Sequence, residues 1–135
     1  MTINQELSLL VREHLHDDVQ QLALQRNRYP QLSDADFRFL LQQIDGYQRT
    51  KDKLPSIAKI DNWWYPVRLS CEQCSSEATA QYKAQIINKL EISKFIDLTG
   101  GYGIDSFFIA EHVKEADYVE RNLELCAIAT HNFAM

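Results

Sequence analysis

The segment FIDLTGGYGID, residues 95–105, constrains the fold of this chain more than any other segment. A short apolar run ends at Asp97, a cluster of glycines follows, and an apolar helical pattern comes next. A glycine-rich turn between a strand and a helix lets a ligand approach the bare backbone. Gly101, Gly103 and Ser106 satisfy the dinucleotide-binding pattern G-x-G-x-x-G only in part, so the glycines alone do not identify a ligand.

Strand and helix patterns alternate around this turn. In chain order, the predicted elements are strand 94–98, helix 104–113, strand 117–120 and helix 122–135. Strand, helix, strand and helix in this order predict a parallel βαβ unit. Another helix is predicted before the first strand, with Ser75 or Ser76 as its N-cap.

Residues 1–50 show helical periodicity without strand patterns. Ser33 and Asp36 form a capping signature, and an apolar stripe at helical spacing follows, made of Phe37, Leu40, Leu41, Ile44 and Tyr47. Residues 49–65 then read as an irregular connector. We therefore expect an α/β chain that is mainly helical: an N-terminal helical bundle with its connector over residues 1–70, and the start of a Rossmann-like domain over residues 71–135.

The composition limits the classes of function. Of the 19 acidic and 14 basic residues, 8 and 3 lie in residues 91–135, so the acidic excess is confined to the end of the chain. This distribution excludes a general affinity for polyanions. No apolar run approaches the length of a membrane span. Three cysteines and an N-terminus with acids inside its apolar region predict a cytoplasmic protein.

Two acids beside the turn indicate which ligand it suits. Asp97, at the end of the first strand, would repel a pyrophosphate, but it would attract the ammonium and sulfonium cations of S-adenosylmethionine. Glu120, at the end of the second strand, is placed to accept hydrogen bonds from ribose hydroxyls. Together with Gly101 and Gly103, these acids favour S-adenosylmethionine over NAD as the cofactor.

On these residues the chain resembles the class I S-adenosylmethionine-dependent methyltransferases. IDLTGGYGID is similar to their motif I, although Thr99 stands in place of its first glycine, and YVERN is similar to motif II. The whole run from residue 69 onward resembles bacterial members with an N-terminal helical region and a THUMP-like domain. A looser likeness is to the small-subunit rRNA guanine-N2 methyltransferases. The resemblance implies a methyltransferase that acts on rRNA or tRNA bases.

The resemblance also implies a set of cofactor-binding residues. Those expected to bind S-adenosylmethionine are Gln73, Ser75, Asp97, Thr99, Gly100, Gly101, Gly103, Asp105, Glu120 and Arg121. For Asp105, capping of the following helix is the preferred interpretation, ahead of ligand contact. No residue is a convincing catalytic base, and the catalytic residues stay unknown.

Two strands do not complete a doubly wound sheet, and the N/D-P-P-Y/F/W motif of amino-group methyltransferases is absent. All three prolines precede the glycine turn. We therefore expect this chain to be the N-terminal portion of a larger enzyme and to have no methyltransferase activity alone. Because open strand edges seek partners, we also expect the fragment to self-associate.

Several alternatives stay open at this stage. A non-catalytic helical interaction module would use the same helices without a cofactor, and an NAD-binding oxidoreductase would use the same turn. Cys71 and Cys74 form a lone C-x-x-C pair, which lacks the second pair of a zinc site, so packing is the preferred interpretation and no metal is expected. Basic residues beside Trp63, Trp64 and Tyr65 allow RNA contact, but packing of these rings is the commoner outcome.

Overall fold

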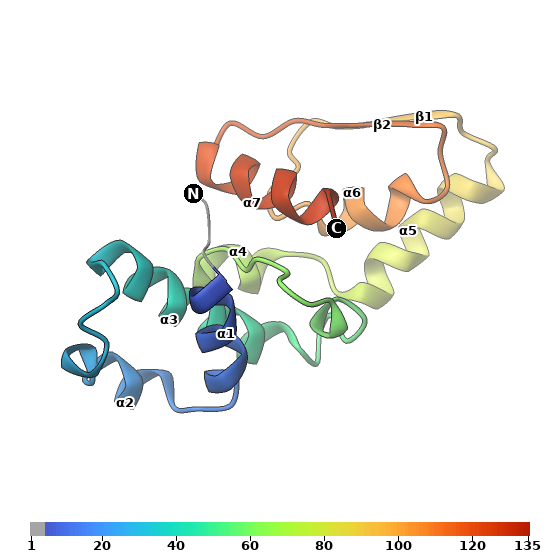
Figure 1. Ribbon diagram of the computed structural model, residues 1–135. Coiled ribbons are helices and arrows are strands. Elements are labelled where there is room, and N and C mark those ends of the chain that lie inside the picture. Colours follow the sequence, from blue (N-terminus) through green and yellow to red (C-terminus); the bar gives the residue numbers. More distant parts are fainter. Residues whose placement is uncertain (1–4) are drawn as a thin grey trace.

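The computed structural model describes residues 5–135, which form a helical part and a smaller strand-containing part (Figure 1). The elements in chain order are α1 (Gln5–His14), α2 (Val19–Ala23), the 3-10 turn η1 (Arg26–Arg28), α3 (Asp34–Thr50), the 3-10 turn η2 (Ile57–Lys59), α4 (Arg68–Gln73), α5 (Glu77–Lys89), β1 (Lys94–Asp97), α6 (Ile104–Ala110), β2 (Glu115–Tyr118) and α7 (Leu123–Phe133). The described chain is mainly helical with a small sheet, as predicted.

Polar side chains fix where several helices begin. The Ser33 hydroxyl accepts a hydrogen bond from the backbone N–H of Asp36, which confirms the capping signature before α3. Ser76, rather than Ser75, caps α5 by accepting from the N–H of Thr79. Asn122 caps α7 in the same way, so each of these helices starts where a side-chain oxygen satisfies a free N–H group.

The βαβ prediction is confirmed. Strands β1 and β2 are parallel, with Phe95 opposite Ala116 and Asp97 opposite Tyr118. The second strand begins and ends two residues earlier than the sequence predicted. Helices α6 and α7 both lie on one side of the sheet in Figure 1. The other face carries Ile96 and Val119, which are half exposed.

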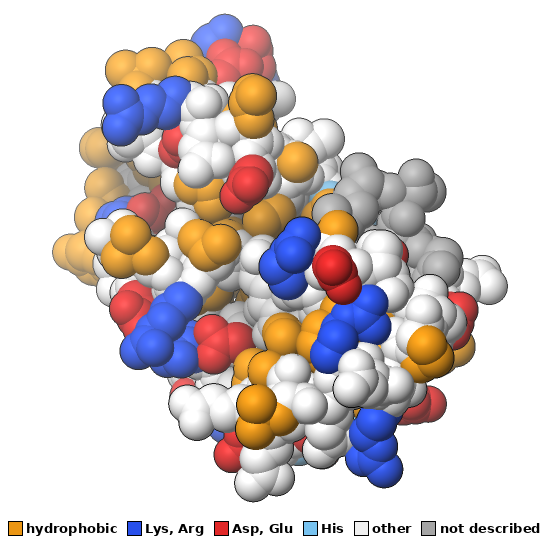
Figure 2. Space-filling model, turned by 90° about the vertical axis from the view of Figure 1, so that its left-hand side faces the viewer, with side chains coloured by type: hydrophobic (Ala, Val, Ile, Leu, Met, Phe, Trp, Pro, Cys, Tyr) orange, Lys and Arg blue, Asp and Glu red, His pale blue; other side chains and the backbone are white. Residues whose placement is uncertain are grey.

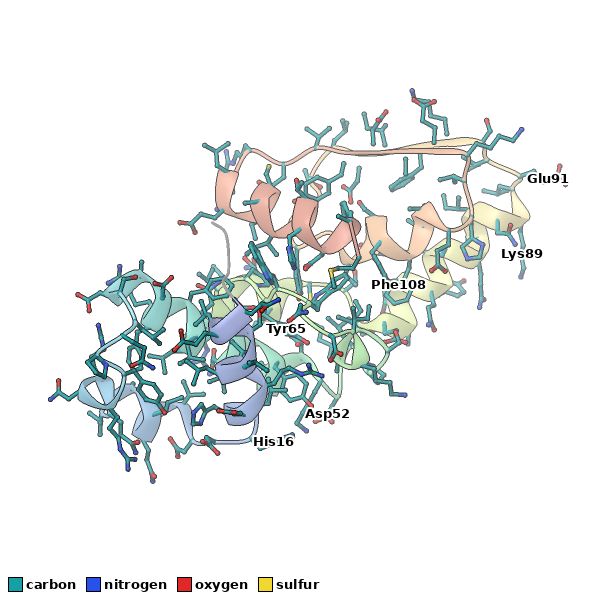
Figure 3. The ribbon with its side chains drawn as sticks, viewed as in Figure 1. His16, Asp52, Tyr65, Lys89, Glu91 and Phe108 are labelled. Atoms are coloured by element: carbon teal, nitrogen blue, oxygen red, sulfur yellow. The ribbon has the colours of Figure 1, made fainter. Side chains whose placement is uncertain are left out.

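The buried apolar side chains form two clusters. One cluster joins α1, α2 and α3, and its centre is formed by Leu40 and Ile44, both fully buried. The larger cluster runs from Leu54 in the connector to Ile128 in α7, so it includes residues from both of the predicted ranges. Figure 3 shows Tyr65 in the interior, whereas Lys89 and Glu91 lie at the far end of α5.

Residues 63–65 link the two parts, and we call them the strap. Gln43 of α3 donates to the carbonyl oxygen of Tyr65 and accepts from its N–H, at 3.0 and 2.7 Å. Asn132 of α7 makes the same pair of bonds to Trp64, at 2.9 and 2.8 Å. His131 also stacks on the Trp64 ring. The strap is therefore held by backbone hydrogen bonds from a helix on each side.

Candidate functional site

The glycine turn between β1 and α6 has the backbone that its sequence requires. Gly101 and Gly103 have φ angles of 54° and 86°, in the left-handed region that glycine adopts without strain. A side chain at Gly103 would press on the ring of Phe133, and one at Gly100 would overlap the ring of Tyr118. The Tyr118 hydroxyl donates to the carbonyl oxygen of Gly101 at 2.6 Å. The turn is thus fixed on its sheet side by an aromatic residue of β2.

Tyr102 anchors the turn to the strap. Its side chain is buried, and its hydroxyl accepts a hydrogen bond from the Trp63 indole N–H at 2.7 Å. The same hydroxyl donates to the carbonyl oxygen of Trp64 at 3.1 Å. Burial raises the pKa of Tyr102 well above its ordinary value, so this phenol stays neutral and keeps its donor. Sequence reasoning missed this role, because nothing local marks a turn tyrosine as buried.

Glu120 lies just beyond β2 and also bonds the backbone of the turn. Its carboxylate accepts from the backbone N–H of Asn122 at 2.8 Å and from that of Gly101 at 2.9 Å. These backbone donors, Asn122 first, lower the pKa of Glu120 below its ordinary value. The residue is therefore ionised at neutral pH. Each carboxylate oxygen has a second lone pair that a ligand hydroxyl can use.

A cavity of about 360 Å³ lies over the turn. It is lined by Ser70, Gln73, Cys74, Ser75, Thr99, Gly100, Gly101, Tyr102, Gly103, Ile104, Asp105, Glu120 and Leu125. The predicted site residues among these come from three separate segments that the fold brings together: the end of α4 with the loop before α5, the glycine turn with the start of α6, and the residues just after β2. Asp105 and Glu120 are the charged residues among the described walls. Lys83 pairs with Asp105 from outside these walls, so the cavity is acidic mainly through Glu120.

Two residues of the predicted set lie elsewhere. Asp97 is not among the described walls, because its carboxylate turns toward the first turn of α6. There it accepts from the N–H of Thr99 at 3.1 Å and from the Ser106 hydroxyl at 2.9 Å. In this position Asp97 braces the turn. Arg121 is exposed and is likewise outside the described walls.

The expectation that Asp105 caps α6 is wrong. Gly103 is the residue at the cap position, and Asp105 lies inside the first turn of the helix. One carboxylate oxygen of Asp105 accepts from Lys83 at 2.7 Å and from the Ser75 hydroxyl at 3.0 Å, which ties α6 to α5 and to the loop before it. The other oxygen is buried and has no hydrogen-bond partner among the described residues.

The C-x-x-C pair has no metal-site geometry around it. No cluster of three His, Cys, Asp or Glu side chains suited to a metal occurs within residues 5–135. The Cys71 thiol is buried and donates to the carbonyl oxygen of Pro66 at 3.3 Å. Cys74 is half-buried and donates to the carbonyl oxygen of Cys71 at 3.2 Å. The geometry supports packing as the role of this pair.

We expect Cys71 to resist alkylation in the folded protein. Burial raises the pKa of its thiol to about 12, and only the thiolate reacts with iodoacetamide. After treatment near pH ~8, peptide mass spectrometry should find Cys71 unmodified in native protein. A urea-unfolded sample is the control and should be modified at all three cysteines. Rapid native labelling of Cys71 would contradict the packing assignment.

None of the helices within residues 5–135 is long and apolar enough to span a membrane. On the face shown in Figure 2, basic and acidic side chains are interspersed, without a field of one sign. The structure thus offers no broad basic surface on this face, in agreement with the charge distribution of the sequence.

Comparison with known proteins gives one informative match. No family model and no curated protein matches the chain. A crystal structure described as a "putative methyltransferase" from Porphyromonas gingivalis W83 matches with a TM-score of 0.76 and 28% sequence identity. The match covers 99% of this chain and 33% of that one, so this chain spans about a third of the length of that protein. The likeness supports a methyltransferase fold for this chain.

Proposed function

We propose that this chain forms part of an S-adenosylmethionine-dependent class I methyltransferase that acts on an RNA base. The observation that carries the proposal is the acidic cavity over the glycine turn. Its described walls combine backbone without side chains at Gly101 and Gly103 with two carboxylates and no basic residue. An acidic cavity suits a ligand with ammonium and sulfonium charges and opposes the pyrophosphate of NAD.

The residues of this chain fit the cofactor in specific ways. Asp105 lines the cavity, and one of its oxygens is buried without a hydrogen-bond partner among the described residues, which is costly for a polar atom. Glu120 would accept from the ribose hydroxyls while it keeps its two backbone bonds. Gln73, at the end of α4, and Ser75, in the loop before α5, would close the cavity. When bound, S-adenosylmethionine supplies an electrophilic methyl group for direct displacement by a nucleophile.

The contribution of this chain to the reaction is positional. Tyr102, Tyr118 and Glu120 hold the turn through hydrogen bonds, so its backbone is fixed before a ligand arrives. No residue among the described walls is placed here as a general base, and we expect methyl transfer to need residues outside this chain. The RNA acceptor follows from the family resemblance of the sequence, not from surface charge.

Calorimetric titration with S-adenosylhomocysteine, with NAD titrated in parallel, tests the proposal. It should be done on this chain and on the longest natural form that contains it. We expect S-adenosylhomocysteine to bind the longer form and NAD to give no signal. Failure of an intact longer form to bind S-adenosylhomocysteine would contradict the proposal and favour a non-catalytic interaction module. A clear NAD isotherm would favour the oxidoreductase alternative.

We also propose that the chain self-associates through the free edge of β1. Among described residues β1 pairs only with β2, and a groove of about 510 Å³ lies beside it against α5. Ile96 and Leu98 are 49% and 69% exposed there.

Sedimentation velocity should show concentration-dependent association that Ile96→Lys reduces. The control Leu24→Lys removes an exposed leucine of the helical part and should change nothing; a strictly monomeric wild-type chain would contradict the proposal.

A further inference from the structure

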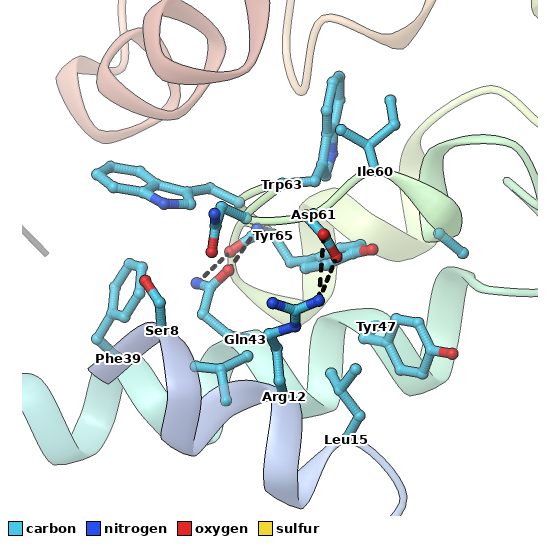
Figure 4. Close-up of a pocket in the computed structure, with 14 residues that line it drawn as sticks. Ser8, Arg12, Leu15, Phe39, Gln43, Tyr47, Ile60, Asp61, Trp63 and Tyr65 are labelled. Atoms are coloured by element: carbon cyan, nitrogen blue, oxygen red, sulfur yellow. Dashed lines mark hydrogen bonds and ion pairs between the residues drawn. The ribbon is translucent and has the colours of Figure 1, made fainter. Parts of the chain in front are cut away.

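A second cavity lies in the helical part, between α1, α3 and the connector (Figure 4). Its volume is about 300 Å³, and it shares no described wall residue with the cavity over the glycine turn. Five aromatic residues line it, namely Phe39, Tyr47, Trp63, Trp64 and Tyr65, and the Trp63 ring also packs on Phe107 and donates to the Tyr102 hydroxyl. This size is at the lower end of small-molecule sites. Aromatic walls of this density offer ring contacts that favour a flat ligand.

The interior of this aromatic cavity is electrically neutral. Gln43 is 2% exposed, and both ends of its amide are already bonded to the backbone of Tyr65. Burial raises the pKa of Tyr65, so its phenol carries no charge at neutral pH. An ionic group placed inside would lose its hydration without gaining a partner. The ligand that fits must therefore have an uncharged ring.

The mouth of the cavity carries one cation and one anion. The Arg12 guanidinium donates to both carboxylate oxygens of Asp61, at 3.0 and 3.1 Å, as the dashed lines in Figure 4 show. The side chains are 55% and 68% exposed, so the pair is weak and can exchange its partners at little cost. Arg12 offers hydrogen-bond donors and Asp61 offers acceptors to the edge of a bound ring.

We propose that this aromatic cavity binds the base of a nucleoside. A nucleobase is flat and uncharged, and its edge carries both donors and acceptors, which are the features that the walls and the mouth require. A free phosphate would meet Asp61, and an amine would meet Arg12. The base is either that of a free nucleoside or an unstacked base of a single-stranded nucleic acid. The inference does not depend on the proposed methyltransferase function.

Tryptophan fluorescence is a direct probe, because the chain has two tryptophans and both line this cavity. Uridine, cytidine and guanosine should each be titrated, with N-acetyltryptophanamide correcting for absorbed light. We expect a saturable change in emission. Ala58→Leu adds volume to the wall and should weaken binding by about tenfold or more, the loss that one stacked contact gives. Ala78→Leu, on the exposed side of α5, is the matched control and should bind as wild type.

Further titrations distinguish a free nucleoside from a base of a nucleic acid, and the aromatic cavity from the acidic one. If a single-stranded tetranucleotide binds more tightly than its nucleoside, the occupant is a base of a nucleic acid; equal affinity identifies a free nucleoside. Saturating S-adenosylhomocysteine should leave the dissociation constant of the nucleoside unchanged, even where it alters the starting emission through Tyr102 and Trp63. Competition between the two ligands would overturn a separate site. The absence of any emission change in the wild type up to millimolar nucleoside would also overturn the proposal. So would a folded Ala58→Leu variant that binds the nucleoside as tightly as the wild type does. Far-ultraviolet circular dichroism verifies that each variant folds.

Discussion

Replacement of Glu120 by alanine is expected to weaken S-adenosylhomocysteine binding by about tenfold to a hundredfold, the range for lost hydrogen bonds to a charged group. The change removes the proposed acceptor for the ribose hydroxyls. It also releases the N–H groups of Gly101 and Asn122, so the turn loses one of its supports. Isothermal titration calorimetry of the longest natural form measures the effect.

Glu120→Gln separates charge from shape, because the amide keeps one acceptor oxygen. We expect its affinity to lie between those of wild type and Glu120→Ala. Glu124→Ala is the control: it removes an acid from the first turn of α7, outside the described walls of the acidic cavity. If the Glu120→Ala variant bound S-adenosylhomocysteine as tightly as the wild type does, Glu120 would not be a cofactor-binding residue.

The pH dependence of the free energy of unfolding tests the role of Glu120 independently of ligand binding. Backbone donors lower the pKa of Glu120 in the folded protein. The ionised side chain therefore stabilises the folded state, and this stabilisation is fully present above the pKa of the unfolded state. That contribution is lost as the pH falls through the folded pKa. The Glu120→Gln variant should therefore lose less stability on acidification than wild type does, measured by urea unfolding across that range.

Gly46→Ala is expected to destabilise the fold, although alanine is the better helix former. Gly46 lies inside α3, and a Cβ there would overlap the Cβ of Tyr65. Tyr65 cannot withdraw, since Gln43 holds its N–H and carbonyl groups and Gln42 bonds the same carbonyl oxygen. The helix gains about 1 kcal/mol from alanine, while overpacking costs about 1–3 kcal/mol or more. The clash involves backbone-linked atoms, so we expect a cost at the upper end of that range and a net loss of about 2 kcal/mol in the free energy of unfolding.

Urea unfolding of the single and double variants tests this explanation. Tyr65→Gly removes the atom with which the new methyl group collides. In that background, Gly46→Ala should stabilise the protein instead, because only the helix propensity changes. A Gly46→Ala variant as stable as wild type would show that α3 and the strap can separate without cost.

Local signals explain what the sequence could predict. The turn glycines, the parallel strands and the caps at Ser33 and Ser76 depend on residues close in the chain, and each was confirmed. The six-residue α4 was missed, because it is too short to show a period of its own. It brings Gln73 to the cavity beside residues more than 25 positions later in the chain.

The roles of the site carboxylates depend on contacts between residues that are distant in the sequence. Asp105 could not be assigned from the sequence, because its partner Lys83 belongs to another helix, 22 positions away. Asp97 was predicted as a ligand residue because it ends the strand, and the Ser106 hydroxyl that binds its carboxylate lies nine positions later, in α6.

The strap also determines which pieces of this chain can be inherited or exchanged separately. A cut between residues 70 and 71 respects the change in sequence pattern. It would nevertheless leave Tyr102 and Asn132 without the main-chain and indole partners that residues 63 and 64 provide. Recombination at that point would pair each half with a surface shaped for another partner. Exchanges that keep the strap with the later half would preserve those contacts but lose the two bonds between Gln43 and Tyr65, so a cut on either side of the strap leaves one half without partners.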